Sequence, residues 1–129
     1  MAQSVLLVED EDSIATALEF LMQREGYLIR RVTTGPAALD AIAEEVPDLV
    51  LLDISLPGAS GYEVCQKIRL DPALSSVKIL MMTATGGAIP RRKSLDMGAD
   101  GFITKPFSVA ALIDEVRRVT GDEETARDV

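Results

Sequence analysis

The fold of this chain is decided by one stretch, Asp48-Leu-Val-Leu-Leu-Asp53-Ile-Ser-Leu-Pro57. Its four consecutive apolar residues are bounded by polar and turn-forming residues, which is typical of a strand buried on both faces of a parallel sheet. Asp53 then lies at the carboxyl end of that strand, where open α/β sheets place their ligands. A carboxylate beside a buried strand costs free energy unless a cation or a donor accompanies it. Asp53 is therefore the first candidate functional residue.

Similar runs and helical spacings alternate along the rest of the chain. The remaining strands are predicted at residues 4–8, 27–32, 78–83 and 101–105, of which 27–32 contains two arginines and suits an exposed edge. Apolar residues recur every three or four positions between them, and this spacing predicts helices at residues 13–25, 35–46, 62–70, 91–97 and 109–118. We expect Asp12 or Ser13 to cap the first helix and Thr33 or Thr34 to cap the second.

The order strand–helix, repeated five times, predicts an α/β fold with a doubly wound parallel sheet that helices cover on both faces. The chain has 129 residues, of which 47% are apolar, and this suits a single domain with an ordinary core. We expect that domain to span residues 1–120 and to be followed by a frayed acidic tail at 121–129.

Composition excludes several classes of function. The formal net charge of −8 argues against direct binding to nucleic acid or to an anionic membrane, both of which need a basic surface. The single cysteine, Cys65, cannot form an internal disulfide and fits a reducing cytoplasm. No signal peptide and no apolar run of about 20 residues is apparent, so we expect a cytoplasmic protein.

The predicted parallel sheet gathers chemically useful residues at one edge. The carboxyl ends of its strands carry Glu9, Asp10, Asp53, Thr83 and Lys105. Three neighbouring carboxylates repel one another, and a divalent cation with hard oxygen ligands, Mg²⁺ or Mn²⁺, relieves that repulsion. With an ammonium and a hydroxyl added, the set suits phosphoryl transfer onto Asp53. Taken alone, each residue also has a structural explanation, such as a solvated helix start for the acidic run.

The sequence resembles the receiver domains of two-component response regulators, the chemotaxis regulator among them. The resemblance runs from Ser4 to about Val119 and is carried by four motifs: Val8-Glu-Asp10, Leu52-Asp-Ile-Ser-Leu-Pro-Gly58 with Gly61, Met82-Thr-Ala84 and Thr104-Lys-Pro-Phe107. It implies a flavodoxin-like arrangement with strand order 2-1-3-4-5. It also implies that Asp53 accepts a phosphoryl group from a histidine kinase or a histidine phosphotransfer protein.

The resemblance further implies a role for each residue of the metal site. Asp10, Asp53 and the main-chain carbonyl of Ser55 would bind Mg²⁺ directly, and Glu9 would act through a water molecule. Mn²⁺ would be an alternative metal at the same ligands.

The remaining implied roles concern the phosphoryl group and the switch. Lys105 and Thr83 would contact phosphoryl oxygens, and the Lys105–Pro106 bond would be cis. Thr83 would move toward the phosphate, and Phe102 would then turn inward and change the surface of the fourth helix, fifth strand and fifth helix. An ordinary strand aromatic is the alternative interpretation of Phe102.

Three other classes are alternatives to a phospho-acceptor switch that catalyses only its own phosphorylation and dephosphorylation. An aspartyl-phosphate phosphatase of the haloacid-dehalogenase type would have a second Asp where Ser55 stands. A flavodoxin would meet repulsion between its flavin phosphate and the acids at residues 9–12, and a pseudo-receiver would lack one of the chemical residues. We expect an unidentified downstream protein partner, and a monomer or a weak phosphorylation-dependent dimer.

Overall fold

The computed structural model describes residues 3–84 and 88–121, and in this part of the chain strands and helices alternate. The strands are β1 (Ser4–Val8), β2 (Leu28–Val32), β3 (Leu49–Asp53), β4 (Lys78–Thr83) and β5 (Gly101–Thr104). The helices are α1 (Asp12–Arg24), α2 (Gly35–Glu44), α3 (Gly61–Leu70), α4 (Ala88–Asp96) and α5 (Val109–Thr120). A 3-10 turn, η1 (Pro72–Leu74), follows α3. The predicted alternation of strands and helices is confirmed.

The strands form one parallel sheet with the order β2-β1-β3-β4-β5. All five residues of the central strand β3 are buried, as its continuous apolar run predicts. The edge strand β2 is partly exposed and carries Arg30 and Arg31. The predicted strand order and the predicted edge position of the second strand are both confirmed.

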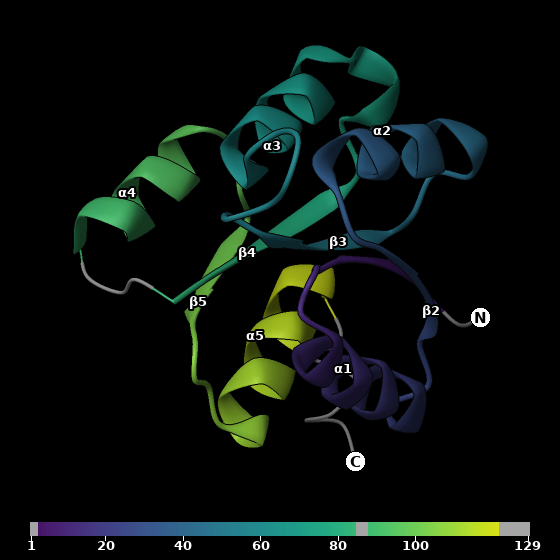
Figure 1. Cartoon of the computed structure of the whole chain (residues 1–129), viewed down its shortest axis with the longest axis vertical. Coiled ribbons are helices and arrows are strands. Elements are labelled where there is room, and N and C mark those ends of the chain that lie inside the picture. Colours follow the sequence, from purple (N-terminus) through teal and green to yellow (C-terminus); the bar gives the residue numbers. More distant parts are fainter. Residues whose placement is uncertain (1–2, 85–87, 122–129) are drawn as a thin grey trace.

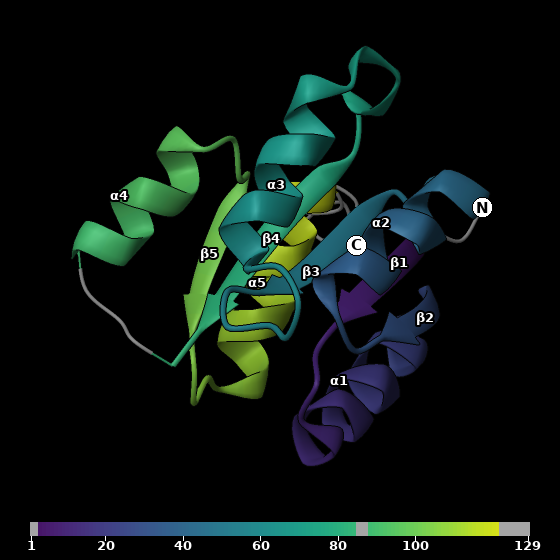
Figure 2. The same cartoon turned by 45° about the horizontal axis from the view of Figure 1, so that its top comes forward.

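Helices cover both faces of the sheet (Figure 1). Side chains alternate between the two faces along each strand, so Leu7 and Leu51 pack on the face of α1 and α5. Their neighbours Leu6 and Leu52 pack on the face of α2 and α3. In the turned view, α4 stands beside β5 at the end of the sheet far from β2 (Figure 2). Because all five strands are parallel, their carboxyl ends lie along the same edge of the sheet.

The helix starts differ in part from those expected. Thr34 is the N-cap of α2 and its side chain accepts a hydrogen bond from Ala37 N at 3.1 Å, as predicted. The predicted cap of α1 is wrong, because its N-cap is Glu11 and no side chain caps that helix. Helix α4 starts at Ala88, three residues before the predicted start at Arg91.

Two further expectations concern membrane-spanning segments and the acidic tail. In residues 3–84 and 88–121, no helix combines the length and apolarity needed to cross a membrane. Helix α5 ends at Thr120, and Gly121 caps it in a left-handed conformation. Gly121 is the first residue of the expected acidic tail, and the rest of that tail lies outside the described residues.

Candidate functional site

The expected site residues lie together at the carboxyl edge of the sheet. Glu9 and Asp10 directly follow β1, and Asp53 is the last residue of β3. Thr83 ends β4 in register with Thr104 of β5, so that Lys105 directly follows that pair. The topology thus brings residues 9, 53 and 105 to one place although they are far apart in the sequence.

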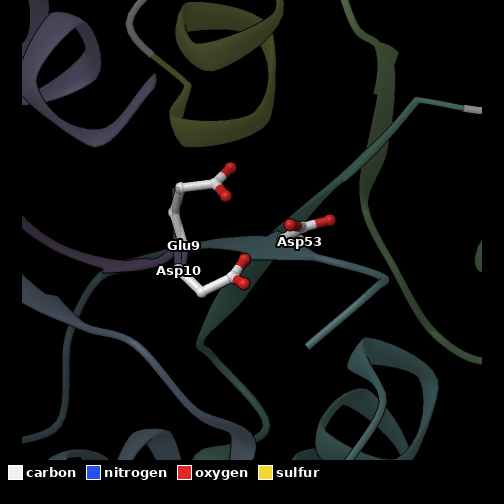
Figure 3. Close-up of side chains that lie close together, drawn as sticks. All are labelled: Glu9, Asp10 and Asp53. Carbon is white, nitrogen blue, oxygen red and sulfur yellow. The ribbon is translucent and has the colours of Figure 1, made fainter. Parts of the chain in front are cut away.

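Three carboxylates form the acidic part of the site. One oxygen from each of Glu9, Asp10 and Asp53 lies within 4.8 Å of the others. Figure 3 shows the three side chains gathered where β1 and β3 end. Glu9 is 0% exposed and Asp53 is 5% exposed, whereas Asp10 is exposed. Two of the three negative charges are therefore shielded from bulk water, which strengthens their mutual repulsion.

Lys105 is the cation of the site. Its Nζ donates to Glu9 Oε1 at 2.7 Å and to Asp53 Oδ2 at 3.2 Å. Burial would lower the pKa of Lys105, but its hydrogen bond to Glu9 and the negative charge of Asp53 outweigh burial and raise that pKa above the ordinary value of 10.5. Lys105 is therefore protonated at neutral pH. The Lys105–Pro106 peptide bond is cis.

Glu9 is the most deeply buried acid of the site. Its burial raises its pKa above the ordinary value of 4.5, and the hydrogen bonds from Lys105 and from Glu11 N oppose this shift. Glu9 Oε2 accepts from Glu11 N at 3.2 Å while Oε1 is bonded to Lys105. Both carboxylate oxygens are thus engaged by protein donors, which holds the side chain in one orientation.

The site fits a hard divalent cation. It offers carboxylate oxygens with a combined charge of −3 against one ammonium, and Mg²⁺ prefers such oxygen ligands together with several waters. Exposed Asp10 gives the cluster an open side through which a hydrated ion can enter. Ser55 lies close by, because its amide donates to Asp53 Oδ1 at 3.1 Å.

The chain around Asp53 is packed closely. A Cβ atom at Gly61, the first residue of α3, would overlap the carbonyl oxygen of Asp53. Gly61 N also donates to Ile54 O at 2.8 Å. A glycine is therefore required at this close approach of two backbone segments, and it brings the start of α3 under the residue that carries the carboxylate.

Thr83 and Phe102 lie on β4 and β5. Both are buried, with 5% and 7% exposure respectively, and Phe102 packs in the core on the face of α2 and α3. The carbonyl of Thr83 accepts from Lys105 N at 2.7 Å. The amide of Phe102 donates to Glu115 Oε2 of α5 at 3.2 Å.

An open pocket of about 580 Å³ lies beside Lys105, between the first turns of α1 and the residues that follow β4 and β5. Its lining is mostly apolar and consists of Glu11, Ser13, Ile14, Ala17, Ala84, Lys105, Pro106 and Phe107. No local sequence pattern indicates this pocket, because its residues come from three separate segments.

Arg31 was not predicted to take part in the site. The sequence indicates only an exposed edge strand, but the guanidinium of Arg31 reaches back to the segment that carries Glu9 and Asp10. The available signal was a charged residue at an edge-strand position that faces α1. The local sequence does not show that its partners are the carbonyl of Glu9 and the carboxylate of Asp12.

Comparisons with known proteins agree on one family. A family model described as the response regulator receiver domain matches residues 5–117. The sensory transduction protein RegX3 of Mycobacterium tuberculosis is 45% identical over 125 residues, which cover 95% of this chain and 54% of that protein. RegX3 of Mycolicibacterium smegmatis is 45% identical over 116 residues. The chain thus spans about half the length of the curated relatives it matches.

Solved structures give the same result. A crystal structure of a putative response regulator from Chloroflexus aurantiacus has a TM-score of 0.90 and 32% identity, covering 94% of this chain and 99% of that one. The receiver domain of a sensor histidine kinase from Pseudomonas aeruginosa has a TM-score of 0.85 and 30% identity, with coverage of 94% and 99%. That domain was crystallised with a magnesium ion coordinated in its active-site cleft.

Proposed function

The chain belongs to the response regulator receiver domain family of two-component systems, and from this premise we propose that Asp53 is its phospho-acceptor. Receiver domains of this family interact with histidine kinases and bind Mg²⁺ in an acidic pocket. The proposal is that Asp53 takes the phosphoryl group of a partner's phosphohistidine in a Mg²⁺-dependent reaction.

One observation carries the proposal, namely the charge imbalance around Asp53. Three carboxylates with oxygens within 4.8 Å of one another face a single ammonium, Lys105. A site with this excess of negative charge favours a divalent cation, and a bound cation would in turn allow a phosphoryl group to approach a carboxylate. An uncompensated buried negative charge is costly, so this excess is a reason to expect a cation from outside the chain.

The proposed reaction transfers one phosphoryl group. An oxygen of the Asp53 carboxylate attacks the phosphorus atom, the new O–P bond forms, and the P–N bond to the donor imidazole breaks. The imidazole leaves with the electron pair of that bond and takes up a proton. Contacts to Glu9 and Asp53 engage two of the three N–H donors of Lys105, and the third can reach a phosphoryl oxygen.

The metal would be held by Asp10 and Asp53, with the main-chain carbonyl of Ser55 as a third protein ligand and Mn²⁺ as an alternative ion. It would supply positive charge that neutralises the phosphoryl oxygens. Glu9 suits an indirect role through water, because Lys105 and Glu11 N already engage its two oxygens.

Thr83 and Phe102 are the proposed switch residues. Phosphorylation adds a charge of about −1.5 to −2 at Asp53, to which the hydroxyl of Thr83 would turn. Phe102 is 7% exposed in this structure, and we propose that it also takes the inward position for part of the time without phosphate. Phosphorylation would therefore act by increasing the population of that position, and with it one form of the α4–β5–α5 surface.

The phosphoryl donor is proposed to be a histidine kinase or a histidine phosphotransfer protein. These 129 residues contain no histidine, so the donor imidazole lies outside them. The apolar pocket beside Lys105 offers a surface on which a partner could dock while its imidazole faces Asp53. We place this exchange in the cytoplasm, where Cys65 stays reduced.

The test is phosphorylation by acetyl phosphate with Mg²⁺, followed by intact-mass measurement. The wild-type chain should gain one phosphoryl group, and it should gain none after chelation of the metal. Asp53→Asn should gain none, whereas the control Asp100→Asn, which removes a carboxylate at the opposite edge of the sheet, should gain one. Equal phosphorylation of Asp53→Asn and wild type would refute the proposal. Steady turnover of a phosphate ester would favour the phosphatase alternative instead.

A further inference from the structure

Arg31 of the edge strand β2 reaches the segment that carries the acidic residues. Its Nε donates to the carbonyl oxygen of Glu9 at 3.1 Å, and its Nη2 lies 2.9 Å from Asp12 Oδ1. We propose that Arg31 is a positioning residue for the metal site, which fixes the connection between β1 and α1 so that Asp10 faces Asp53. This inference rests on the proposed function, since it assumes that Mg²⁺ binds there.

The main chain of Glu9 is held from β2 at both of its polar groups. Glu9 N donates to Val32 O at 3.1 Å, and Glu9 O accepts from Arg31. The side chain of Glu9 is held separately, by Lys105 and by Glu11 N. Without Arg31, the carbonyl of Glu9 would lose its partner from β2, and one restraint on the peptide group that joins Glu9 to Asp10 would be removed.

Arg31 contacts residues on either side of Asp10. Its two contacts, the Glu9 carbonyl and the Asp12 carboxylate, lie one residue before and two residues after it. Asp10 itself is exposed, so its own packing does little to orient it. The hydrogen bond to the Glu9 carbonyl is the main restraint, because the Asp12 carboxylate is 91% exposed and Arg31 Nη2, which has no hydrogen-bond partner among the described residues, meets it only as an ion pair. Restraining this short segment lowers the conformational entropy that metal binding would otherwise cost.

The arrangement follows from the alternation of side chains along β2. Arg31 pairs in register with Leu7, whose side chain lies on the face of α1, and so it can reach the start of that helix. Its neighbour Arg30 pairs with Leu6 on the opposite face. There Arg30 donates to carbonyls of Ala41 and Glu45 at the end of α2. Two adjacent arginines therefore make similar main-chain contacts, and only one of them touches the acidic segment.

Charge and position predict opposite effects of Arg31 on the metal. As a nearby cation, Arg31 would repel Mg²⁺, and its removal would tighten binding. As a positioning residue, it improves binding, and its removal would weaken it. Asp12 lies 2.9 Å from the guanidinium and offsets its charge, so we expect the positional effect to dominate.

The experiment measures Mg²⁺ affinity by calorimetric titration of the wild-type chain and of Arg31→Gln, Arg31→Lys and Arg30→Gln. Arg31→Gln should weaken Mg²⁺ binding about tenfold, which is the typical effect of removing a group that orients a metal ligand. Arg31→Lys should resemble Arg31→Gln, because a lysine keeps the charge but cannot reach both contacts with a rigid fork. Arg30→Gln should bind Mg²⁺ like wild type.

A second measurement separates positioning from general loss of structure. Phosphorylation by acetyl phosphate is followed as a function of Mg²⁺ concentration. Arg31→Gln should need about tenfold more Mg²⁺ for half of the maximal rate and should reach nearly the wild-type rate at saturation.

The outcomes distinguish this inference from the function beneath it. Tighter Mg²⁺ binding in Arg31→Gln, unchanged binding, or an equal loss in Arg30→Gln would overturn the role of Arg31 and leave the phospho-acceptor proposal intact. Failure of the wild-type chain itself to bind Mg²⁺ would overturn the proposed function instead.

Discussion

The sheet has an ionic cluster at each of its two edges, and the two clusters differ in charge balance. At the amino edge, Arg69 of α3 donates to Asp100 Oδ2 at 2.7 Å and to Gly98 O at 2.8 Å, and Asp100 Oδ2 also accepts from Ile79 N at 2.9 Å. One positive charge faces one negative charge. At the carboxyl edge, one ammonium faces three carboxylates.

The difference separates a structural role from a functional one. The pair of Arg69 and Asp100 joins α3 to the segment before β5, and it needs no outside charge, although Arg69 Nη1 is buried without a hydrogen-bond partner among the described residues. Within residues 3–84 and 88–121, the cluster of three carboxylates around Asp53 is bonded to one ammonium, that of Lys105. Repulsion among these carboxylates costs stability in the metal-free fold, and we expect a bound cation to relieve that cost.

The largest expected effect is stabilisation of the fold by Mg²⁺, which supplies positive charge to the carboxylates around Asp53. At a Mg²⁺ concentration of about 100 times the dissociation constant, the wild-type chain should gain about 2.7 kcal/mol in the free energy of unfolding. Asp100→Asn should show the same gain with Mg²⁺, because Asp100 pairs with Arg69 at the amino edge of the sheet, away from the metal site. Thermal unfolding with Mg²⁺ and with chelator measures both. No difference between these conditions for wild type would contradict the assignment of the unbalanced edge.

The second effect is the loss of a balanced pair. Asp100→Asn should destabilise the fold by about 2 kcal/mol, because a partly buried guanidinium loses its counter-charge while the amide can still accept from Ile79 N. Urea unfolding in chelator provides the measurement. Arg69→Met is the matched change of the partner. A destabilisation below about 0.5 kcal/mol in both variants would contradict the structural role of the Arg69–Asp100 pair.

The third effect is an increase in the free energy of unfolding, opposite to the decrease expected for Asp100→Asn. Asp53→Asn should stabilise the metal-free chain by about 1 kcal/mol, because it removes one of three mutually repelling charges and keeps an oxygen that can accept from Ser55 N. The variant loses the contact of Lys105 with Asp53 at 3.2 Å, but Lys105 keeps its shorter bond to Glu9 at 2.7 Å. Urea unfolding in chelator, beside Asp100→Asn, compares the same chemical change at both edges. Destabilisation of both variants to the same extent would show that the two clusters do not differ in charge balance.

The smallest effect concerns a third ionic contact, Glu115 of α5. Hydrogen bonds from Arg118, together with the Phe102 amide, lower the pKa of Glu115 below its ordinary value of 4.5, although burial acts in the opposite direction. A lowered folded-state pKa contributes stability above the unfolded-state pKa, and this contribution is lost as the pH falls through the folded-state pKa. Glu115→Gln should therefore cost about 0.5 kcal/mol at neutral pH and nothing once the carboxyl group is protonated in both states. Urea unfolding across this pH range tests it, and a cost that persists in acid would mean that the charge is irrelevant.

The fold could be predicted from sequence because its signals are local. The apolar run before Asp53 and the helical spacing in α5 each lie within one element. Once five strand–helix units are recognised, the handedness of parallel connections leaves few arrangements, and Asp53 must lie at the carboxyl edge. The cap of α1 could not be predicted in this way, because the helix already begins at Asp12 and its N-cap is Glu11, whose side chain makes no capping hydrogen bond.

The detailed geometry of the site could not be read in the same way. The contact between Lys105 and Glu9 joins positions 96 residues apart, and it competes with the contact between Lys105 and Asp53. Arg31 reaches the acidic segment across 22 positions. Contacts of this kind depend on side-chain length and on the direction in which each strand presents its residues, neither of which leaves a local pattern.

The contacts between α5 and β5 have a consequence for association between copies of the chain. An edge strand exposes amide and carbonyl groups that can template a strand from another molecule. Glu115 occupies the amide of Phe102, and Arg118 donates to the carbonyl of Asp100 at 3.0 Å, so a pair of side chains takes the place that a neighbouring strand would occupy. Helix α5 thereby also protects this end of the sheet from pairing with a strand of another copy.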